Sequence, residues 1–234
     1  MSTHALDHSE HHRRSSDMVR DVVLGLADGL TVPFALAAGV SSAGASSAII
    51  VTAGAAEIAA GAIAMGIGGY LAARSDVEHY ESEYRREVEE THMMPAEERA
   101  EVADVFARFG VAGDLLDQLV DRIASDRTRW VDFMMRFELG LERPDRRRAP
   151  VSAATIGASY VAGGVIPLAP YVVLHDIASA LLWSIGLTLT ALLIFGAAKA
   201  RINEVNPWVG AAQTALTGGI AAAVAFSLAK LVAR

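Results

Sequence analysis

The sequence predicts an all-α membrane protein with five transmembrane helices and a cytoplasmic three-helix metal-binding domain inserted between spans two and three. Hydrophobic residues make up 53% of the 234 residues, although 20% are charged. The charge is concentrated, since 19 of the 27 acidic and 13 of the 20 basic residues lie between Arg74 and Pro150. The remainder holds nearly uncharged runs of about 20 residues, which is the length that crosses a hydrocarbon core.

This pattern divides the chain into four segments. A polar tail covers residues 1–17, spans one and two cover 18–73, the polar helical domain covers 74–149, and spans three to five cover 150–234. The tail carries four histidines, which we interpret as part of a disordered segment rather than a metal site: His4, His8, His11 and His12. We expect the five spans at about Met18–Val40, Ala48–Ala73, Val151–Leu168, Ile177–Ala198 and Trp208–Val232.

Three helices are expected in the polar domain. The first, SDVEHYESEYRREVEETHM, continues the second span without a break. The second, PAEERAEVADVFARFG, starts with Pro95 in its first turn and ends at Gly110. The third, DLLDQLVDRIASDRTRWVDFMMRFELGL, has apolar residues at three-to-four spacing and stops before Pro144.

The distribution of Lys and Arg predicts the orientation. Basic residues cluster around the start of span one, in the middle segment and before span five. If the chain crosses the membrane five times, these three clusters lie on the same side of the membrane. Because basic loops stay in the cytoplasm, the tail, the polar domain and the loop with Lys199 are expected there.

Composition excludes several classes of function. The chain has no cysteine, which excludes disulfides and thiolate metal sites. Its net charge of −7 argues against a nucleic-acid partner, because phosphate binding needs a basic face. No prosthetic group and no enzymatic activity are expected.

Two acids lie inside apolar helices, Asp28 in span one and Glu57 in span two. An Asp at the centre of a spanning helix costs on the order of 3 kcal/mol by insertion scales, so such groups usually have a task. Met65, on the antiparallel second span, is expected at the same depth in the membrane as Asp28. A carboxylate beside a thioether is a suitable ligand pair for a transition-metal cation. The structural alternatives are that Asp28 caps a helix break near Gly29, that Met65 only packs, and that Glu57 bonds to a neighbouring helix.

The polar domain holds a second group of candidate ligands. Glu83, Glu87 and Glu90 share one helical face, Glu98 and Glu101 share another, and Met134, Met135 and Glu138 lie within about one turn. Acidic stripes are often only solvated faces, but like charges on three neighbouring helices favour a bound cation. Glu89 and His92 have the spacing of di-iron carboxylate sites, without a second such pair.

The stretches VRDVVLGLADGLTVPFALAAG and GAAEIAAGAIAMGIGGYLAARSDVEHYESE, with MMRFE on the last polar helix, resemble the vacuolar iron transporter family. The resemblance covers nearly the whole chain. It implies a homodimer that exchanges ferrous iron for protons along the two-fold axis, with Asp28 and Met65 as the intramembrane pair and Glu57 as a further pore carboxylate. It also implies cytoplasmic metal ligands at Glu87, Glu90, Glu98, Glu101, Met134, Met135 and Glu138.

The leading hypothesis is therefore a proton-coupled antiporter that moves ferrous iron out of the cytoplasm. Manganese is a further expected substrate, and zinc and cobalt are candidates; protons and membrane lipid are the other expected partners. One alternative is a membrane-anchored carboxylate-bridged iron oxidase or storage protein that uses Glu89 and His92. Another is a metal sensor in which the spans only anchor the polar domain.

Overall fold

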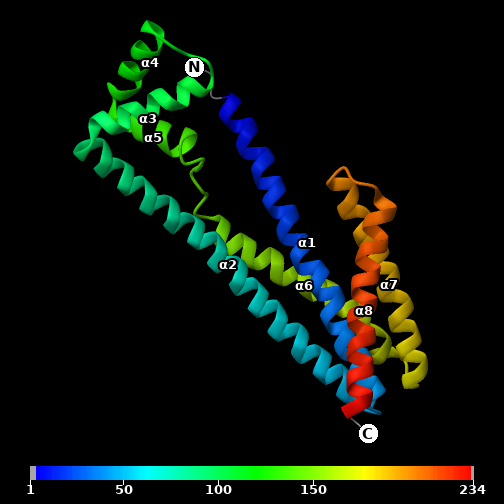
Figure 1. Cartoon of the computed structure of the whole chain (residues 1–234). Helices are drawn as coiled ribbons and strands as arrows, with labels where there is room; N and C mark the ends of the chain where they lie inside the picture. Colours follow the sequence, from blue (N-terminus) through cyan, green and yellow to red (C-terminus); the bar gives the residue numbers. More distant parts are fainter. Residues whose placement is uncertain (1–3, 233–234) are drawn as a thin grey trace. The chain divides into compact units, whose positions relative to one another are not determined.

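Helices account for all regular structure in the described chain. The computed structural model describes the backbone of residues 4–232 and the side chains of Asp17 to Val232. Within that part the protein has eight helices and no strand (Figure 1). They are α1 (His4–Ser42), α2 (Ser47–Met93), α3 (Pro95–Arg108), α4 (Asp114–Ala124), α5 (Arg127–Phe137), α6 (Arg148–Val173), α7 (Ile177–Ile202) and α8 (Pro207–Val232). The predicted all-α class is confirmed.

Five of these helices are long and apolar enough to cross a membrane: α2, α6, α7, α8 and the Asp17–Ser42 part of α1. Their number and order match the prediction. Helix α6 extends to Val173, past the predicted end at Leu168, and contains Pro167 and Pro170. Proline is tolerated in a spanning helix because neighbouring helices satisfy the backbone groups that it frees.

The N-terminal segment differs from the prediction. Helix α1 begins at His4, where we expected a disordered tail. No Gly or Pro occurs between His4 and Val22, so nothing in the sequence interrupts the helix. The side chains of the four predicted tail histidines lie outside the described residues.

The chain folds as two compact units. The membrane unit consists of the described residues up to Tyr70 and from Pro150 onward, and the polar unit is Leu71–Ala149. The boundary falls inside α2, which is one continuous helix of 47 residues. The polar unit has nearly the bounds predicted for the polar domain.

Close backbone contacts join the helices of the membrane unit. Helix α1 packs against α7 and α8. A Cβ atom on Gly29 would overlap the α6 backbone at Tyr160, and one on Gly196 of α7 would overlap the α8 backbone at Gly210. Small residues thus permit the close approach that holds helices together in lipid. An apolar cluster joins α1, α2, α6 and α7: Ala37, Ile50, Ile58, Leu168, Tyr171 and Ala180.

The polar unit contains the end of α2 together with α3, α4 and α5. The last three helices share an apolar core, formed by Val102, Val105, Val120, Trp130, Phe133 and Met134. Here the predicted single third helix is wrong, because α4 ends at Ala124 and α5 begins at Arg127. The Asp126 carboxylate accepts a hydrogen bond of 3.0 Å from the Arg129 N–H and so caps α5. The apolar periodicity continues across this break, which hid it from the sequence analysis.

Candidate metal centres

The polar unit brings three glutamates together. Glu87 and Glu90 lie one turn apart on α2, and Glu98 lies in the first turn of α3. One carboxylate oxygen from each lies within 4.8 Å of the others. Pro95 starts α3 directly after Met94, and the turn at this point brings Glu98 to the two glutamates of α2. Three carboxylates at this spacing match the oxygen ligands that hard divalent cations prefer.

Two of these carboxylates are buried without full hydrogen bonding. Glu87 is 2% exposed and Glu98 is 3% exposed. The Oε2 atom of each is buried and has no hydrogen-bond partner among the described residues. Such an oxygen is costly unless a partner satisfies it, and a cation between the carboxylates would do so. Arg86 supplies only part of the compensation, with Nη2 3.8 Å from Glu87 Oε1.

Electrostatics extends the group to five residues. Burial, followed by the charges of Glu138 and Glu90, raises the pKa of Glu87 from 4.5 to about 7. Burial likewise raises the pKa of Glu98 to about 7, with Glu101 and Glu87 contributing. Partial burial, then Glu101 and Glu90, raise the pKa of Glu138. We call the five residues Glu87, Glu90, Glu98, Glu101 and Glu138 the glutamate cluster.

The predicted methionine ligands are both buried on α5. Met134 is 0% exposed and packs in the apolar core of the polar unit, and Met135 is 1% exposed. Glu138 follows them at the end of α5, where its N–H donates to the Met134 carbonyl. Burial of Met134 is accounted for by its apolar neighbours, so a ligand role for these sulfurs stays a prediction.

The Glu89 and His92 pair lies outside the three-carboxylate group. Both side chains are exposed. Nη1 of Arg127 lies 2.6 Å from Nε2 of His92, so a guanidinium occupies the place where a metal would bind the imidazole. Glu83 is also outside the group, and its Oε2 pairs with Arg86 at 2.9 Å. This arrangement does not favour the oxidase alternative.

In the membrane unit, Glu57 forms a hydrogen bond across two helices. The Tyr160 hydroxyl on α6 donates to Glu57 Oε1 on α2 at 2.5 Å. Glu57 Oε2 is buried with no hydrogen-bond partner among the described residues. The bond to a neighbouring helix that we considered for Glu57 is therefore present.

The other intramembrane candidates are less enclosed. Asp28 is exposed in the single chain, and α1 continues through Gly29, so Asp28 caps no helix break. Met65 is half-buried on α2, two turns beyond Glu57. Its pairing with Asp28 stays a prediction.

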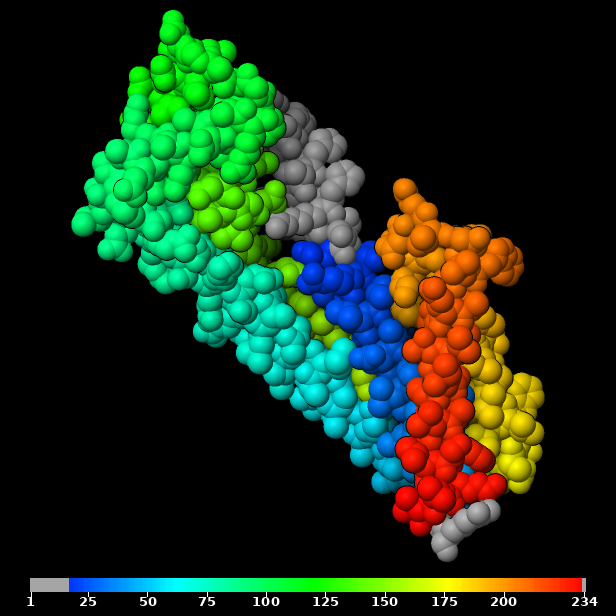
Figure 2. All heavy atoms as spheres, viewed as in Figure 1, coloured from blue at the N-terminus to red at the C-terminus, as the bar shows by residue number. Residues whose placement is uncertain are grey.

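Helix α2 has an open face. Only 17% of its most apolar 18-residue window is buried. Exposed small residues line it at four-residue spacing, namely Ala56, Ala60, Ala64 and Gly68. In the view of Figure 2 no other segment lies in front of the cyan part of this helix. Open apolar helix faces are typical of surfaces that contact lipid or another chain.

Tyr160 is the residue that sequence reasoning missed. It is 2% exposed, and a Cβ atom on Gly61 would overlap its ring, so the missing side chain of Gly61 makes room for the phenol. A lone tyrosine among the small residues of IGASYVAGG was the available signal. Its partner lies 103 residues away, and sequence spacing alone does not reveal such a pairing.

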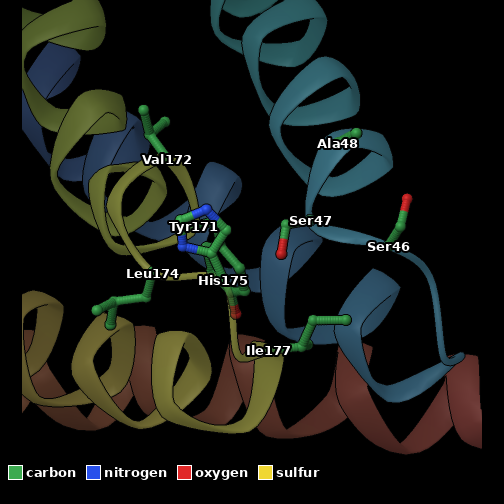
Figure 3. A pocket seen from close by; sticks show the side chains of 8 residues that line it. All are labelled: Ser46, Ser47, Ala48, Tyr171, Val172, Leu174, His175 and Ile177. Carbon is green, nitrogen blue, oxygen red and sulfur yellow. The ribbon is translucent and has the colours of Figure 1, made fainter.

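A separate pocket of about 410 Å³ opens where α2 begins and α6 joins α7 (Figure 3). Half of its eight lining residues are apolar, and the others offer polar groups from two serines, Tyr171 and His175: Ser46, Ser47, Ala48, Tyr171, Val172, Leu174, His175 and Ile177. No carboxylate is among these described lining residues, so the pocket lacks the ligands of a divalent-metal site.

Comparison with known sequences places this architecture in a family. The sequence model of the VIT family matches residues 19–230. The chain belongs to the VIT family. The vacuolar iron transporter 1 of Arabidopsis thaliana is 51% identical over 225 residues, covering 96% of this chain and 90% of the relative. The protein of the same name from Oryza sativa subsp. japonica is 50% identical, covering 96% and 89%. Protein CCC1 of Saccharomyces cerevisiae is 34% identical over 228 residues, covering 92% and 69%.

The VIT-family match includes all the candidate residues of both units and leaves out the whole histidine tail, residues 1–17. The resemblance stated from the sequence is confirmed. The plant relatives are named as transporters, which agrees with the expectation that this chain is not an enzyme.

Proposed function

We propose that this VIT-family protein is a proton-coupled antiporter that moves ferrous iron out of the cytoplasm. The observation that carries the proposal is the pair of acids on spanning helices, Asp28 on α1 and Glu57 on α2, the second of which is held by a buried phenol. Ionisable groups at membrane depth mark ion and proton pathways because keeping them there is costly. The names of the plant relatives, vacuolar iron transporters, support iron as the substrate.

The intramembrane groups divide the work in this proposal. The Asp28 carboxylate neutralises the cation, and the Met65 thioether favours iron or manganese over magnesium and calcium. Glu57 accepts the counter-transported proton. Manganese is the second proposed substrate, with zinc and cobalt as further candidates.

The polar unit collects the metal before transport. The proposed ligands are Glu87, Glu90, Glu98, Glu101, Met134, Met135 and Glu138. The unpartnered oxygens of Glu87 and Glu98 support this role, since a cation would satisfy them. The metal is cargo here and not a resident cofactor.

The protein acts as a homodimer with the polar unit in the cytoplasm. Asp28 is exposed in the single chain, and a carboxylate facing lipid would be costly. A second copy of the chain would cover this carboxylate, and the open small-residue face of α2 is suited to the close helix contact that a dimer needs. The distribution of Lys and Arg supports the orientation. The membrane is vacuolar, as in the names of the relatives, or the plasma membrane if the source is bacterial.

Reconstitution in liposomes tests the proposal. The full-length protein is inserted into vesicles that hold a metal-quenched dye and a pH dye, and ferrous iron is added outside under a proton gradient. Metal entry with matching proton movement is expected. Binding without flux would overturn the transporter.

A double variant, Glu87→Ala with Glu90→Ala, tests the collector. We expect it to weaken flux several-fold at low metal concentration and much less at saturation. The control is Glu89→Ala with Glu97→Ala, which removes two exposed glutamates of the polar unit, one from α2 and one from α3. Equal losses in both double variants would contradict the collector role.

A further inference from the structure

Tyr160 is fixed on all sides in the membrane unit. Its side chain is 2% exposed, and its ring fills the space that Gly61 leaves open on α2. Its backbone touches α1 at Gly29, where a Cβ atom would overlap the Tyr160 carbonyl. Helix α6 cannot move away from α1 or α2 at this level without losing these contacts, since packed interiors tolerate little change in volume.

The hydroxyl of this fixed ring meets Glu57. The O–H donates to Oε1 at 2.5 Å, at the short end of the range for hydroxyl donors. A hydrogen bond to a carboxylate is stronger than one between neutral groups, and a low local dielectric strengthens it further. The other oxygen, Oε2, is buried and has no partner among the described residues.

We infer that Tyr160 is a positioning residue for Glu57: its hydroxyl holds Oε1 and leaves Oε2 as the one oxygen that Glu57 offers to a passing ion. The inference rests on the proposed function and deepens it. Because Oε1 of Glu57 accepts the hydrogen bond from the phenol, Glu57 cannot coordinate a cation with both oxygens unless that hydrogen bond first breaks. Glu57 then has only Oε2 available for binding. One carboxylate oxygen is enough to accept a proton, whereas a tightly bound metal would use both.

Helix α1 also contacts Tyr160, but through its backbone. Gly29 touches the Tyr160 carbonyl, and the acid Asp28 is the residue before Gly29.

The test compares two tyrosines of one helix. Tyr160→Phe removes the hydroxyl and keeps the ring. The matched control is Tyr171→Phe on α6, since Tyr171 is also 2% exposed and its hydroxyl accepts a hydrogen bond of 2.9 Å from Ser41. Both variants are made in the full-length protein in lipid, so each loses one buried hydrogen bond from the same helix.

Infrared spectroscopy gives a readout that does not depend on transport. The carboxyl stretching band of Glu57 is identified by its loss in Glu57→Gln. We expect Tyr160→Phe to shift that band and Tyr171→Phe to leave it in place. A band that stays in place in Tyr160→Phe, or that shifts equally in both variants, would overturn the inference.

Flux in liposomes gives the second readout. Tyr160→Phe should lower the maximal rate of ferrous iron flux by roughly tenfold, the loss expected for one hydrogen bond to a charged group, with a smaller change in KM. Tyr171→Phe should stay within about twofold of the unmodified protein. If the unmodified protein shows no flux, the proposed function fails, while the infrared shift still decides the role of Tyr160.

A second variant covers the case in which Tyr160→Phe does not fold. Gly61→Ala places a methyl group where the phenol lies and should displace the hydroxyl from Glu57, shifting the same band. Its control is Gly186→Ala on α7, where an added Cβ meets nothing within 4 Å. An unshifted band in Gly61→Ala would also count against the inference.

Discussion

At the scale of single residues, the glutamate cluster is the most unusual chemistry outside the spans. Glu87 and Glu98 are buried with unpartnered oxygens, and the pKa of each is raised to about 7. Near neutral pH these groups are therefore only partly ionised without metal. Metal must displace protons from them, so binding to the cluster depends on pH.

The stability of the metal-free polar unit should fall as pH rises. A carboxyl whose pKa is higher in the folded state than its ordinary 4.5 binds protons more tightly when folded. Its stabilising effect is complete below about 4.5 and is lost as pH rises toward about 7. We expect a loss on the order of 1–3 kcal/mol across that window, which manganese should reverse at high pH.

Fluorescence of Trp130 measures this effect, because Trp130 lies in the core of the polar unit. Trp183 and Trp208, both exposed on spanning helices, are first replaced by Phe so that Trp130 is the only reporter. A metal-free unit that becomes steadily more stable between about pH 5 and pH 8 would contradict the raised pKa values.

Neighbouring glutamates on α3 give a sharp test of the cluster. Glu98 is buried beside α2, whereas Glu97 is exposed. Glu98→Gln should weaken manganese binding by roughly tenfold or more, since a carboxylate ligand is lost from a buried site. Glu97→Gln, with the same chemical change one residue away, should leave binding within about twofold. Titration calorimetry on the full-length protein distinguishes the two outcomes, and equal effects would refute the cluster as the binding site.

Sequence spacing singled out these glutamates, because three- and four-residue spacings place them on one helical face, and their role as ligands stays a prediction. It did not predict which member would be buried, since that depends on how α3 folds back after Met94. Tyr160 was missed for a related reason. Its importance depends on contacts with Gly61 and Glu57 from another helix, and helical periodicity carries no information about such contacts.

At the scale of elements, close contact between α1 and α6 organises the membrane unit. Gly29→Ala should disrupt it, because the added Cβ atom overlaps the Tyr160 carbonyl. Overpacking of this kind costs roughly 1–3 kcal/mol. The contrasting variant is Gly186→Ala, which meets open space on α7 and should be neutral or stabilising by up to about 1 kcal/mol.

Thermal aggregation of the two glycine variants in detergent compares them directly. We expect the midpoint of Gly29→Ala to drop by several degrees and that of Gly186→Ala to stay at or above the unmodified value. An unchanged midpoint in Gly29→Ala would mean that the packing of α1 on α6 does not depend on this contact.

The elements themselves were largely predictable. Hydropathy located all five spans, and Pro95 marked the start of α3. The break between α4 and α5 was not found, because Ser125 and Asp126 interrupt the helix through a local cap while apolar residues keep their helical spacing on both sides. The start of α1 was also missed, since polar composition was read as disorder despite the absence of helix breakers.

At the scale of the whole molecule, charged and apolar residues are concentrated in different segments of the chain. These segments fold into two compact units, the polar unit and the membrane unit. The boundary lies within a single helix, so α2 carries Glu57 in one unit and Glu87 and Glu90 in the other. Membership of the VIT family accounts for both units, because the match spans them. The proposed division of work assigns collection to the polar unit and passage to the membrane unit.

The central claim is that Asp28 lies on the route of the ion. The most direct measurement is simultaneous metal and proton flux in liposomes that contain Asp28→Ala, with calorimetry on the same preparation. The proposal predicts that both fluxes disappear together while the glutamate cluster still binds manganese as in the unmodified protein. Unchanged flux in Asp28→Ala would contradict it, because the ion would then cross the membrane without the carboxylate on which the account depends.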